Sequence, residues 1–286
     1  MFDKTYKSTI KVIIRSPLMW LTFSLFIGVA IYEVLKVHYN VYQPEIARTL
    51  TDIDSEFVLP YNLYIQEFEN STLRSLMWYP MPTFAVISVV VVLIGDYRNS
   101  FYEIKKAGGI KPFDHCLGQI VALITVNTLV FFLVSFSSLH AYYISRNILS
   151  WMSPINYFSE TSIRHLRVFW GAGMPGMLLF ISVPYAIGNL FKSGWASAIS
   201  GIVFVLASYL SSYYFSWRMP EAYQYFAPGG HYLYSYMTFY DTQWFNIKKV
   251  VNPFSTKDVI ICLSILYSIS AICIIFSWLS TKKREI

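Results

Sequence analysis

The stretch GDYRNSFYEIKKAGGIKPFDHCLGQ, residues 95–119, decides how the rest of the sequence is interpreted. It is polar and basic, and it separates two long apolar runs, 77–95 and 117–139. As a helix, each run is long enough to cross a hydrocarbon core of about 30 Å. The stretch between them therefore predicts a loop that joins two membrane spans on one side of a bilayer.

The composition agrees with a membrane protein. Of the 286 residues, 55% are hydrophobic and 13% are charged, whereas a soluble domain carries about 25% charged residues. The net charge of +6 comes from short basic clusters beside apolar runs, so we expect membrane lipid and no nucleic acid as a partner. The three cysteines, an odd number, predict neither a disulfide framework nor a metal site.

Six apolar runs are predicted as transmembrane helices of one domain, residues 1–286, in an all-α integral membrane protein. They cover about 18–35, 77–95, 117–139, 168–191, 195–217 and 259–279. We expect two long segments, 36–76 and 218–258, on the extracellular side, together with the polar and aromatic residues 141–167. The sequence leaves open whether 218–258 dips back into the bilayer as short helices.

Residues 2–15 predict an amphipathic helix that lies in the membrane interface. Apolar side chains recur at helical spacing, and a second face is basic. The apolar positions are Phe2, Tyr6, Ile10, Ile13 and Ile14, and the basic ones are Lys4, Lys7, Lys11 and Arg15. Anionic lipid would attract the basic face. A charged segment ahead of the first span is the alternative, and it gives the same topology.

The distribution of charge predicts the orientation. Twelve of the 22 Lys and Arg residues, but only five of the 16 Asp and Glu residues, fall in four places: the first 15 residues, the loop 95–119, the turn at Lys192 and the last residues of the sequence. Cytoplasmic segments are enriched in Lys and Arg. We therefore expect these segments and both termini in the cytoplasm, and the chain in a cell membrane, which we expect to be bacterial.

Patterns of catalysis and ion transport are missing from the sequence. The centres of the six runs hold no ionisable residue, which argues against a proton- or ion-coupled transporter. The motifs H-E-x-x-H, G-x-S-x-G and G-x-x-x-x-G-K-[ST] do not occur. We expect no enzyme activity and no catalytic, cofactor-binding or metal site in this chain. The five histidines are scattered, and His115 is interpreted as a surface residue near the interface.

The order of the segments and a few short stretches carry a resemblance. The relevant residues are Asp96 and Arg98, SFYEI at 100–104, Leu117-Gly118 and the turn FKSG at 191–194. Through these, the chain resembles the permease subunit of ATP-binding-cassette (ABC) exporters of the type-2 family. The resemblance covers nearly the whole chain, through architecture more than signature motifs. Gly108-Gly109 stands where the family often has a proline, and Gln119 where it often has a lysine.

The resemblance implies a mechanism. Two permeases, identical or homologous, pair in the membrane, and separate cytosolic ATPase subunits beneath them hold ATP and Mg. A short coupling helix between the second and third spans, here about 97–106, would sit in a cleft of the ATPase. The residues implied in this contact are Arg98, Phe101, Tyr102, Glu103, Ile104, Lys105 and Lys106. Membrane orientation alone also accounts for the basic residues among them.

The expected function is therefore export of an amphipathic or hydrophobic substrate, such as a peptide, a lipid or a drug. An uncharged, aromatic-lined route suits such cargo better than small ions. One alternative is a non-transporting receptor or immunity subunit that binds a peptide at 36–76 and 218–258. Another is a membrane enzyme acting on lipid, which would need polar catalytic residues at one interface. A neighbouring gene for a cassette ATPase would favour export.

Overall fold

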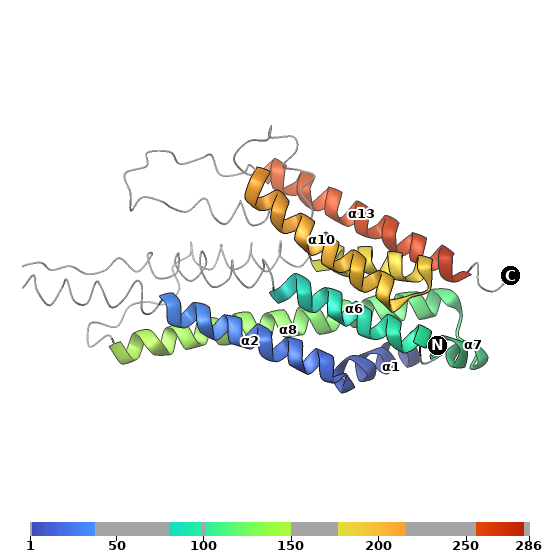
Figure 1. The fold of residues 1–286 in the computed structure, drawn as a ribbon, viewed down its shortest axis with the longest axis horizontal. Helices are drawn as coiled ribbons and strands as arrows, with labels where there is room; N and C mark the ends of the chain where they lie inside the picture. The colour runs from blue at the N-terminus through green and yellow to red at the C-terminus, as the bar shows by residue number, and fades with distance from the viewer. Residues whose placement is uncertain (1, 38–79, 99–100, 150–176, 216–255, 283–286) are drawn as a thin grey trace, which may run out of the picture.

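The computed structural model describes residues 2–37, 80–98, 101–149, 177–215 and 256–282. These residues form helices and short connections, and the described part of the chain contains no strand. The labelled helices in Figure 1 are α1 (Phe2–Arg15), α2 (Pro17–Val37), α6 (Pro80–Arg98), α7 (Phe101–Ala107), α8 (Pro112–Leu149), α10 (Gly194–Phe215) and α13 (Thr256–Lys282). One further helix, Met177–Phe191, precedes α10.

Among the described residues, three helices are long and apolar enough to cross a membrane: Pro80–Arg98, Pro112–Val134 and Ser264–Lys282. The pair α1 and α2 makes a fourth candidate if it is taken as one broken span, which bends by 66°. The Met177–Phe191 helix and Gly194–Ala207 of α10 are shorter and apolar. An all-helical fold with helices of membrane length is thus present, as the composition predicts. The expected count of six spans stays a prediction.

Several expected boundaries can be compared with the helices. The helix of the second apolar run, α6, continues to Arg98, so Asp96, Tyr97 and Arg98 belong to this long helix and not to the loop. The next long helix begins at Pro112 and runs to Leu149, into the segment expected outside. The segments 38–79, 150–176 and 216–255 lie outside the described residues, and with them the bulk of both long segments that were expected to be extracellular.

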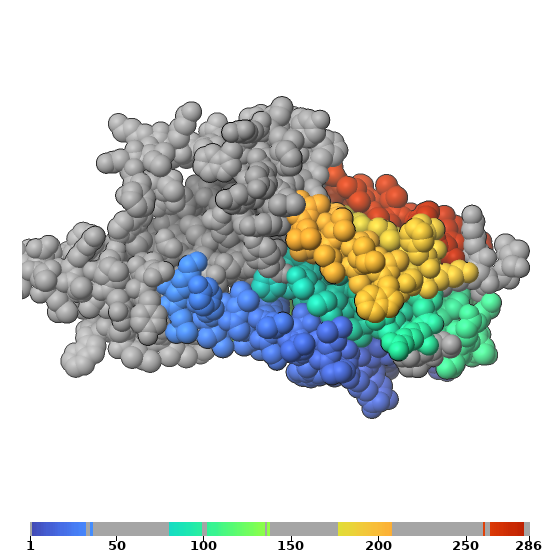
Figure 2. All heavy atoms as spheres, viewed as in Figure 1, coloured from blue at the N-terminus to red at the C-terminus, as the bar shows by residue number. Residues whose placement is uncertain are grey.

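Helix α6 occupies the centre of the bundle. It packs against α1, α2, α8 and α10. Figure 2 shows its surface between those of α2 and α10 on one face of the molecule. Its apolar side chains enter the main core, where Phe84, Val89 and Leu93 are almost completely buried. Because α6 packs against several helices, side chains at its C-terminal end can join them.

Large apolar side chains cover the outside of the bundle. On α10 they are Trp195, Ile199, Ile202, Val203 and Leu206, and on α2 they include Trp20, Leu21, Leu25 and Ile31. So many exposed large apolar side chains are unusual for a soluble monomer and are typical of contact with lipid or with another subunit. The exterior therefore agrees with a helix bundle that is surrounded by membrane.

The N-terminal helix α1 is helical as predicted, and its basic side chains are exposed. It packs mainly on α8, with Thr5, Thr9 and Ile13 buried, whereas Ile14 of the expected apolar face is 53% exposed. The contact is close at Gly118 of α8, where an added Cβ atom would lie 2.9 Å from Cβ of Thr5. Thus α1 is docked on the bundle through small side chains.

The short helix α7 ends in a glycine cap. The backbone N–H of Gly109 donates to the carbonyl of Lys106, and that of Ile110 donates to the carbonyl of Lys105. This is the Schellman arrangement, which needs a left-handed residue, and Gly109 has a φ of 77°. Pro112 then begins α8, at a position where its missing N–H has no helical partner to lose.

Candidate functional site

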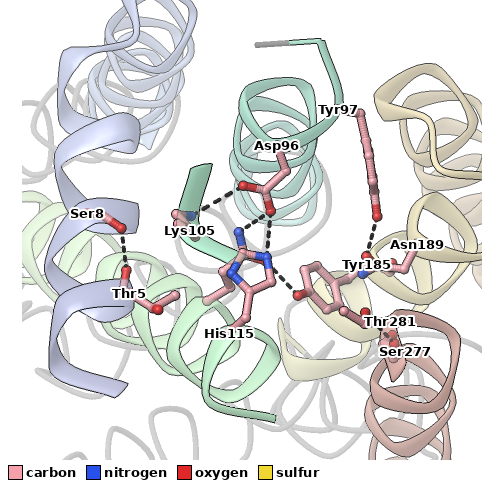
Figure 3. A network of polar contacts seen from close by, with 11 residues as sticks. Thr5, Ser8, Asp96, Tyr97, Lys105, His115, Tyr185, Asn189, Ser277 and Thr281 are labelled. Atoms are coloured by element: carbon pink, nitrogen blue, oxygen red, sulfur yellow. Dashed lines mark hydrogen bonds and ion pairs between the residues drawn. The ribbon is translucent and has the colours of Figure 1, made fainter. Parts of the chain in front are cut away.

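A buried carboxylate joins three helices at the end of the bundle that carries α7. Asp96, in the last turn of α6, is only 5% exposed (Figure 3). Its Oδ1 lies 3.3 Å from Nζ of Lys105 on α7. Its Oδ2 lies 2.9 Å from Nε2 of His115 and accepts a 2.6 Å hydrogen bond from Nε2 of Gln119, both on α8.

The secondary structure explains why these side chains meet. His115 and Gln119 are four residues apart and therefore stack on one face of α8. Helix α7 and its glycine cap reverse the chain direction between α6 and α8. The first turns of α8 therefore lie beside the last turn of α6, which carries Asp96. A carboxylate acts only as an acceptor when ionised, so Nε2 of His115 carries the hydrogen of this contact. A buried carboxylate needs such partners, because an unpaired buried charge is strongly destabilising.

The contacts continue into the Met177–Phe191 helix and return to α6. The hydroxyl of Tyr185 donates to Oε1 of Gln119 at 2.7 Å. Nδ2 of Asn189 donates to the backbone carbonyl of Tyr185 at 2.9 Å. The hydroxyl of Tyr97, next to Asp96, donates to Oδ1 of Asn189 at 2.6 Å. We call Asp96, Tyr97, Lys105, His115, Gln119, Tyr185 and Asn189 the Asp96 network.

The turn after Asn189 is tightly built. Lys192 has a φ of 53°, and the N–H of Ser193 donates to the carbonyl of Gly188 at 3.0 Å. α10 begins at Gly194, where an added Cβ would lie 2.5 Å from Cγ1 of Ile94 on α6. The expected short turn FKSG is therefore pressed against the same part of α6 that carries Asp96.

Helix α7 has an inner and an outer face. On the inner face, Tyr102 is 6% exposed and its ring centroid lies 4.9 Å from that of His115, while Lys105 reaches Asp96. On the outer face, Glu103, Ile104 and Lys106 are exposed, and Ile104 is 64% exposed.

The seven residues implied in ATPase contact therefore divide into groups. Tyr102 and Lys105 face the bundle, and Glu103, Ile104 and Lys106 face away from it. Arg98 is exposed at the end of α6. Phe101 begins α7, and its side chain lies outside what the structure describes. Tyr102, which the resemblance implied in the ATPase contact, is buried, and its ring contacts that of His115 in the first turn of α8.

Sequence reasoning missed most of the Asp96 network. His115 was expected at the surface but is 4% exposed, since it lies inside the hairpin between α7 and α8. Gln119, Tyr185 and Asn189 fall in apolar runs and were given no role. The available signal was spacing: His115 and Gln119, like Tyr185 and Asn189, are polar pairs four residues apart near a predicted span end. Their convergence on Asp96 is a tertiary contact.

The network is suited to holding helices together. Its groups are carboxylate, amide, ammonium, imidazole and phenol, each of which bonds to another helix or to its own backbone. Within the described residues, no group of three His, Cys, Asp or Glu side chains is placed to hold a metal ion. Comparison of the chain with protein-family models, with curated proteins and with solved structures finds no match.

Proposed function

We propose that this chain is the membrane-spanning permease subunit of an ATP-driven exporter, with the architecture of the type-2 ABC family. In this proposal it has six spans and α7 is the coupling helix. The end of the bundle that carries α7 faces the cytoplasm of a bacterial cell, with both chain termini. Separate ATPase subunits hold ATP and Mg, and the cargo is an amphipathic or hydrophobic molecule such as a peptide, a lipid or a drug.

The observation that carries the proposal is the attachment of α7. A short exposed helix between two long apolar helices is expected to move freely unless something fixes it. Here Lys105 and Tyr102 connect it to Asp96 and His115, and the network continues to Tyr185. A force on the outer face of α7 would therefore reach α6, α8 and the Met177–Phe191 helix together, which is what coupling to a motor requires.

The outer face of α7 supplies the chemistry of a docking contact. Ile104 offers an exposed apolar side chain, and Glu103 and Lys106 flank it with opposite charges. A buried apolar anchor with charged neighbours that set the orientation is a common arrangement in protein interfaces. The ATPase would contact this face, whereas Tyr102 and Lys105 would pass its movement inward.

A second permease is part of the proposal. The apolar outside of α2 and α10 provides two surfaces on either side of α6 for lipid or for a partner subunit (Figure 2). Interfaces between membrane helices are usually built from close packing and not from exclusion of water. Whether the partner is an identical chain is an outcome of the purification described next.

Gentle purification from the native membrane tests the function directly. We expect a cassette ATPase to be recovered with the chain and identified by mass spectrometry. Ile104→Ala should lower that recovery several-fold. Ile14→Ala on α1 is the control and should not lower it, although Ile14 is also exposed, at 53% against 64% for Ile104. Absence of any ATPase from the wild-type preparation would reject the exporter proposal. Full recovery with Ile104→Ala would reject α7 as the docking site.

A thiol-labelling experiment tests the orientation separately. Cys116 is buried, so a cysteine is better placed at exposed Lys106 by the substitution Lys106→Cys. A membrane-impermeant maleimide should label this cysteine only after the cells are permeabilised. Labelling in intact cells would place α7 outside and remove the basis for ATPase contact.

A further inference from the structure

The basic side chains of α1 share one exposed face, which is turned away from the bundle. They are Lys4, Lys7, Lys11 and Arg15. Their steps of three and four residues place them one above another on the helix, where like charges repel and weaken it. One charge is balanced by Asp3, whose carboxylate lies 2.8 Å from Nζ of Lys7. The other three have no acidic partner in the described part of the chain.

The opposite face of α1 makes an incomplete contact with the bundle. Its most deeply buried side chains are Thr5, Thr9 and Ile13, and only the last is large and apolar. Oγ1 of Thr5 and Oγ1 of Thr9 have no hydrogen-bond partner among the described residues, which is unfavourable for a buried hydroxyl. Thr5 nevertheless fits closely against Gly118 of α8. The contact is therefore complementary in shape but lacks these polar bonds, and the repulsion on the outer face opposes it.

The position of α1 brings its basic face to the level of lipid headgroups. α1 lies at the end of the bundle that carries α7 (Figure 1) and bends by 66° from α2. For an α2 that crosses the bilayer, α1 is thus closer to the membrane plane than to its normal. Exposed apolar side chains begin directly after the bend, at Leu18, Trp20 and Leu21, and indole rings favour the interface. Nε1 of Trp20 donates to the carbonyl of Ile14 at 2.7 Å, which ties the basic helix to this apolar edge.

We propose that anionic phospholipid headgroups bind the basic face of α1 and thereby hold this helix on α8. Attraction of a basic N-terminal helix to such lipid is expected from the sequence, and the structure adds the contact that this attraction would stabilise. Headgroup phosphates balance the three unpaired cations, whose long side chains can reach from the helix to the lipid. The charge of the membrane then decides whether Thr5 stays against Gly118, which is next in sequence to Gln119 of the Asp96 network. This dependence requires neither an ATPase nor a second permease, so it goes beyond the export function.

Cysteine labelling of the full chain in lipid nanodiscs measures the seating of α1. Thr9→Cys places a thiol on the buried face, and Ile14→Cys places one at an exposed position of the same helix. The rate of reaction with N-ethylmaleimide is measured for both, and mass spectrometry separates their peptides from those of the native cysteines. The ratio of the first rate to the second removes any general effect of the lipid on thiol reactivity. We expect this ratio to be several-fold lower in phosphatidylglycerol than in phosphatidylcholine.

A triple variant tests whether α1 itself responds to the lipid charge. Its substitutions are Lys4→Gln, Lys11→Gln and Arg15→Gln, and they should make the ratio equal in the two lipids. High salt should reduce the difference in the unsubstituted face, because it screens exposed charges. Glycerol phosphate added to phosphatidylcholine nanodiscs should not reproduce the effect of phosphatidylglycerol. If it does, the face binds a phosphate from solution, and the lipid is not its partner.

A second triple variant is the matched control. It removes three exposed basic residues of other segments, by Lys111→Gln, Lys192→Gln and Lys282→Gln, and should keep the difference between the lipids. Loss of the difference in this control would show a general response to surface charge and overturn the proposal. Equal ratios in the two lipids with the basic face intact would overturn it as well.

Hydrogen exchange of the wild-type chain gives the same comparison if Thr9→Cys fails to fold. Faster exchange of the α1 backbone amides in phosphatidylcholine than in phosphatidylglycerol supports the proposal, and equal exchange rejects it. None of these measurements uses the ATPase, so a failure here and a failure of the exporter proposal are told apart.

Discussion

Two polar clusters are buried in this bundle, and they differ in how fully their hydrogen bonds are made. In the Asp96 network, both carboxylate oxygens, both amide side chains and both tyrosine hydroxyls have partners, and the atom without one is Nδ1 of His115. Around Asn127 the donors are used and one carbonyl oxygen is left over. The first cluster joins several helices, whereas the second joins α8 to α6 and leaves one acceptor without a partner in the described part of the chain.

The difference follows from the number of helices that reach each place. Asp96 lies where α6, α7, α8 and the Met177–Phe191 helix end or begin, so partners arrive from several directions. Asn127 reaches one other helix, through Ser88 of α6, and its remaining bond is to Leu123 of its own helix. Mutations at the two clusters should therefore affect the free energy of unfolding very differently, which can be measured by SDS titration of the purified chain.

The largest effect is expected from Asp96→Ala. It leaves Lys105 without its partner and removes the acceptor of two α8 side chains, so we expect the free energy of unfolding to fall by about 3 kcal/mol. Arg98→Ala, at an exposed position on the same helix end, should change it by less than about 0.5 kcal/mol.

A double variant sharpens this prediction. Asp96→Ala with Lys105→Ala should be less destabilised than the sum of the two single variants, by about 1 kcal/mol, because the second change removes the stranded ammonium. Strict additivity would mean that the ion pair contributes no coupling between α6 and α7.

The next largest effect is expected from Gly118→Leu, which involves no polar group. The new side chain would collide with Thr5 and force α1 away from α8. Overpacking of this kind costs about 2 kcal/mol. Gly28→Ala is the control, since nothing lies within 4 Å of an added Cβ at Gly28. That change should leave the unfolding free energy equal or raise it, because alanine favours helix.

A smaller effect is expected from Tyr185→Phe, which removes one hydroxyl from the Asp96 network. Oε1 of Gln119 would lose its donor, and the free energy of unfolding should fall by about 1 kcal/mol. Tyr267→Phe makes the matched change at a half-exposed tyrosine and should be neutral within about 0.5 kcal/mol. Equal effects of the two variants would show that Tyr185 is merely packed.

The smallest effect is expected at the second cluster. Asn127→Leu replaces an incompletely bonded amide by an apolar group of similar size, while Oγ of Ser88 keeps its bond to Ala85. We expect a change of less than about 1 kcal/mol, with either sign. A loss as large as that of Asp96→Ala would erase the contrast between the clusters and show that Asn127 mainly holds α6 to α8.

Helices and their ends could be predicted from the sequence where a local pattern or a single residue determines the backbone conformation. Apolar runs predicted the long helices. The resemblance implied a short helix at about 97–106, and the structure has a short helix at Phe101–Ala107, α7, with residues 97 and 98 in α6 instead. Gly108-Gly109, noted as a departure from the family pattern, ends α7 because Gly109 takes a positive φ. The expected C-terminal ends of two spans were less accurate. Helix α6 continues past the apolar run 77–95, and α8 continues past the run 117–139.

The candidate site was mostly beyond sequence reasoning. Asp96 and Lys105 lie in a conspicuous polar stretch, but their partners Tyr185 and Asn189 come from a helix many residues later. Periodicity assigns a face to each helix, and it does not say which faces meet. His115 shows the limit, because its neighbours Pro112 and Asp114 suggest a surface and only the hairpin covers it.

The two oxygens of the Asp96 carboxylate bind different helices. One oxygen is held by α7 through Lys105, and the other by α8 through His115 and Gln119. Loss of the Lys105 contact alone would therefore leave α6 and α8 joined, because His115 and Gln119 bind the other oxygen. The joint between the two long helices does not depend on the ion pair that attaches the short one.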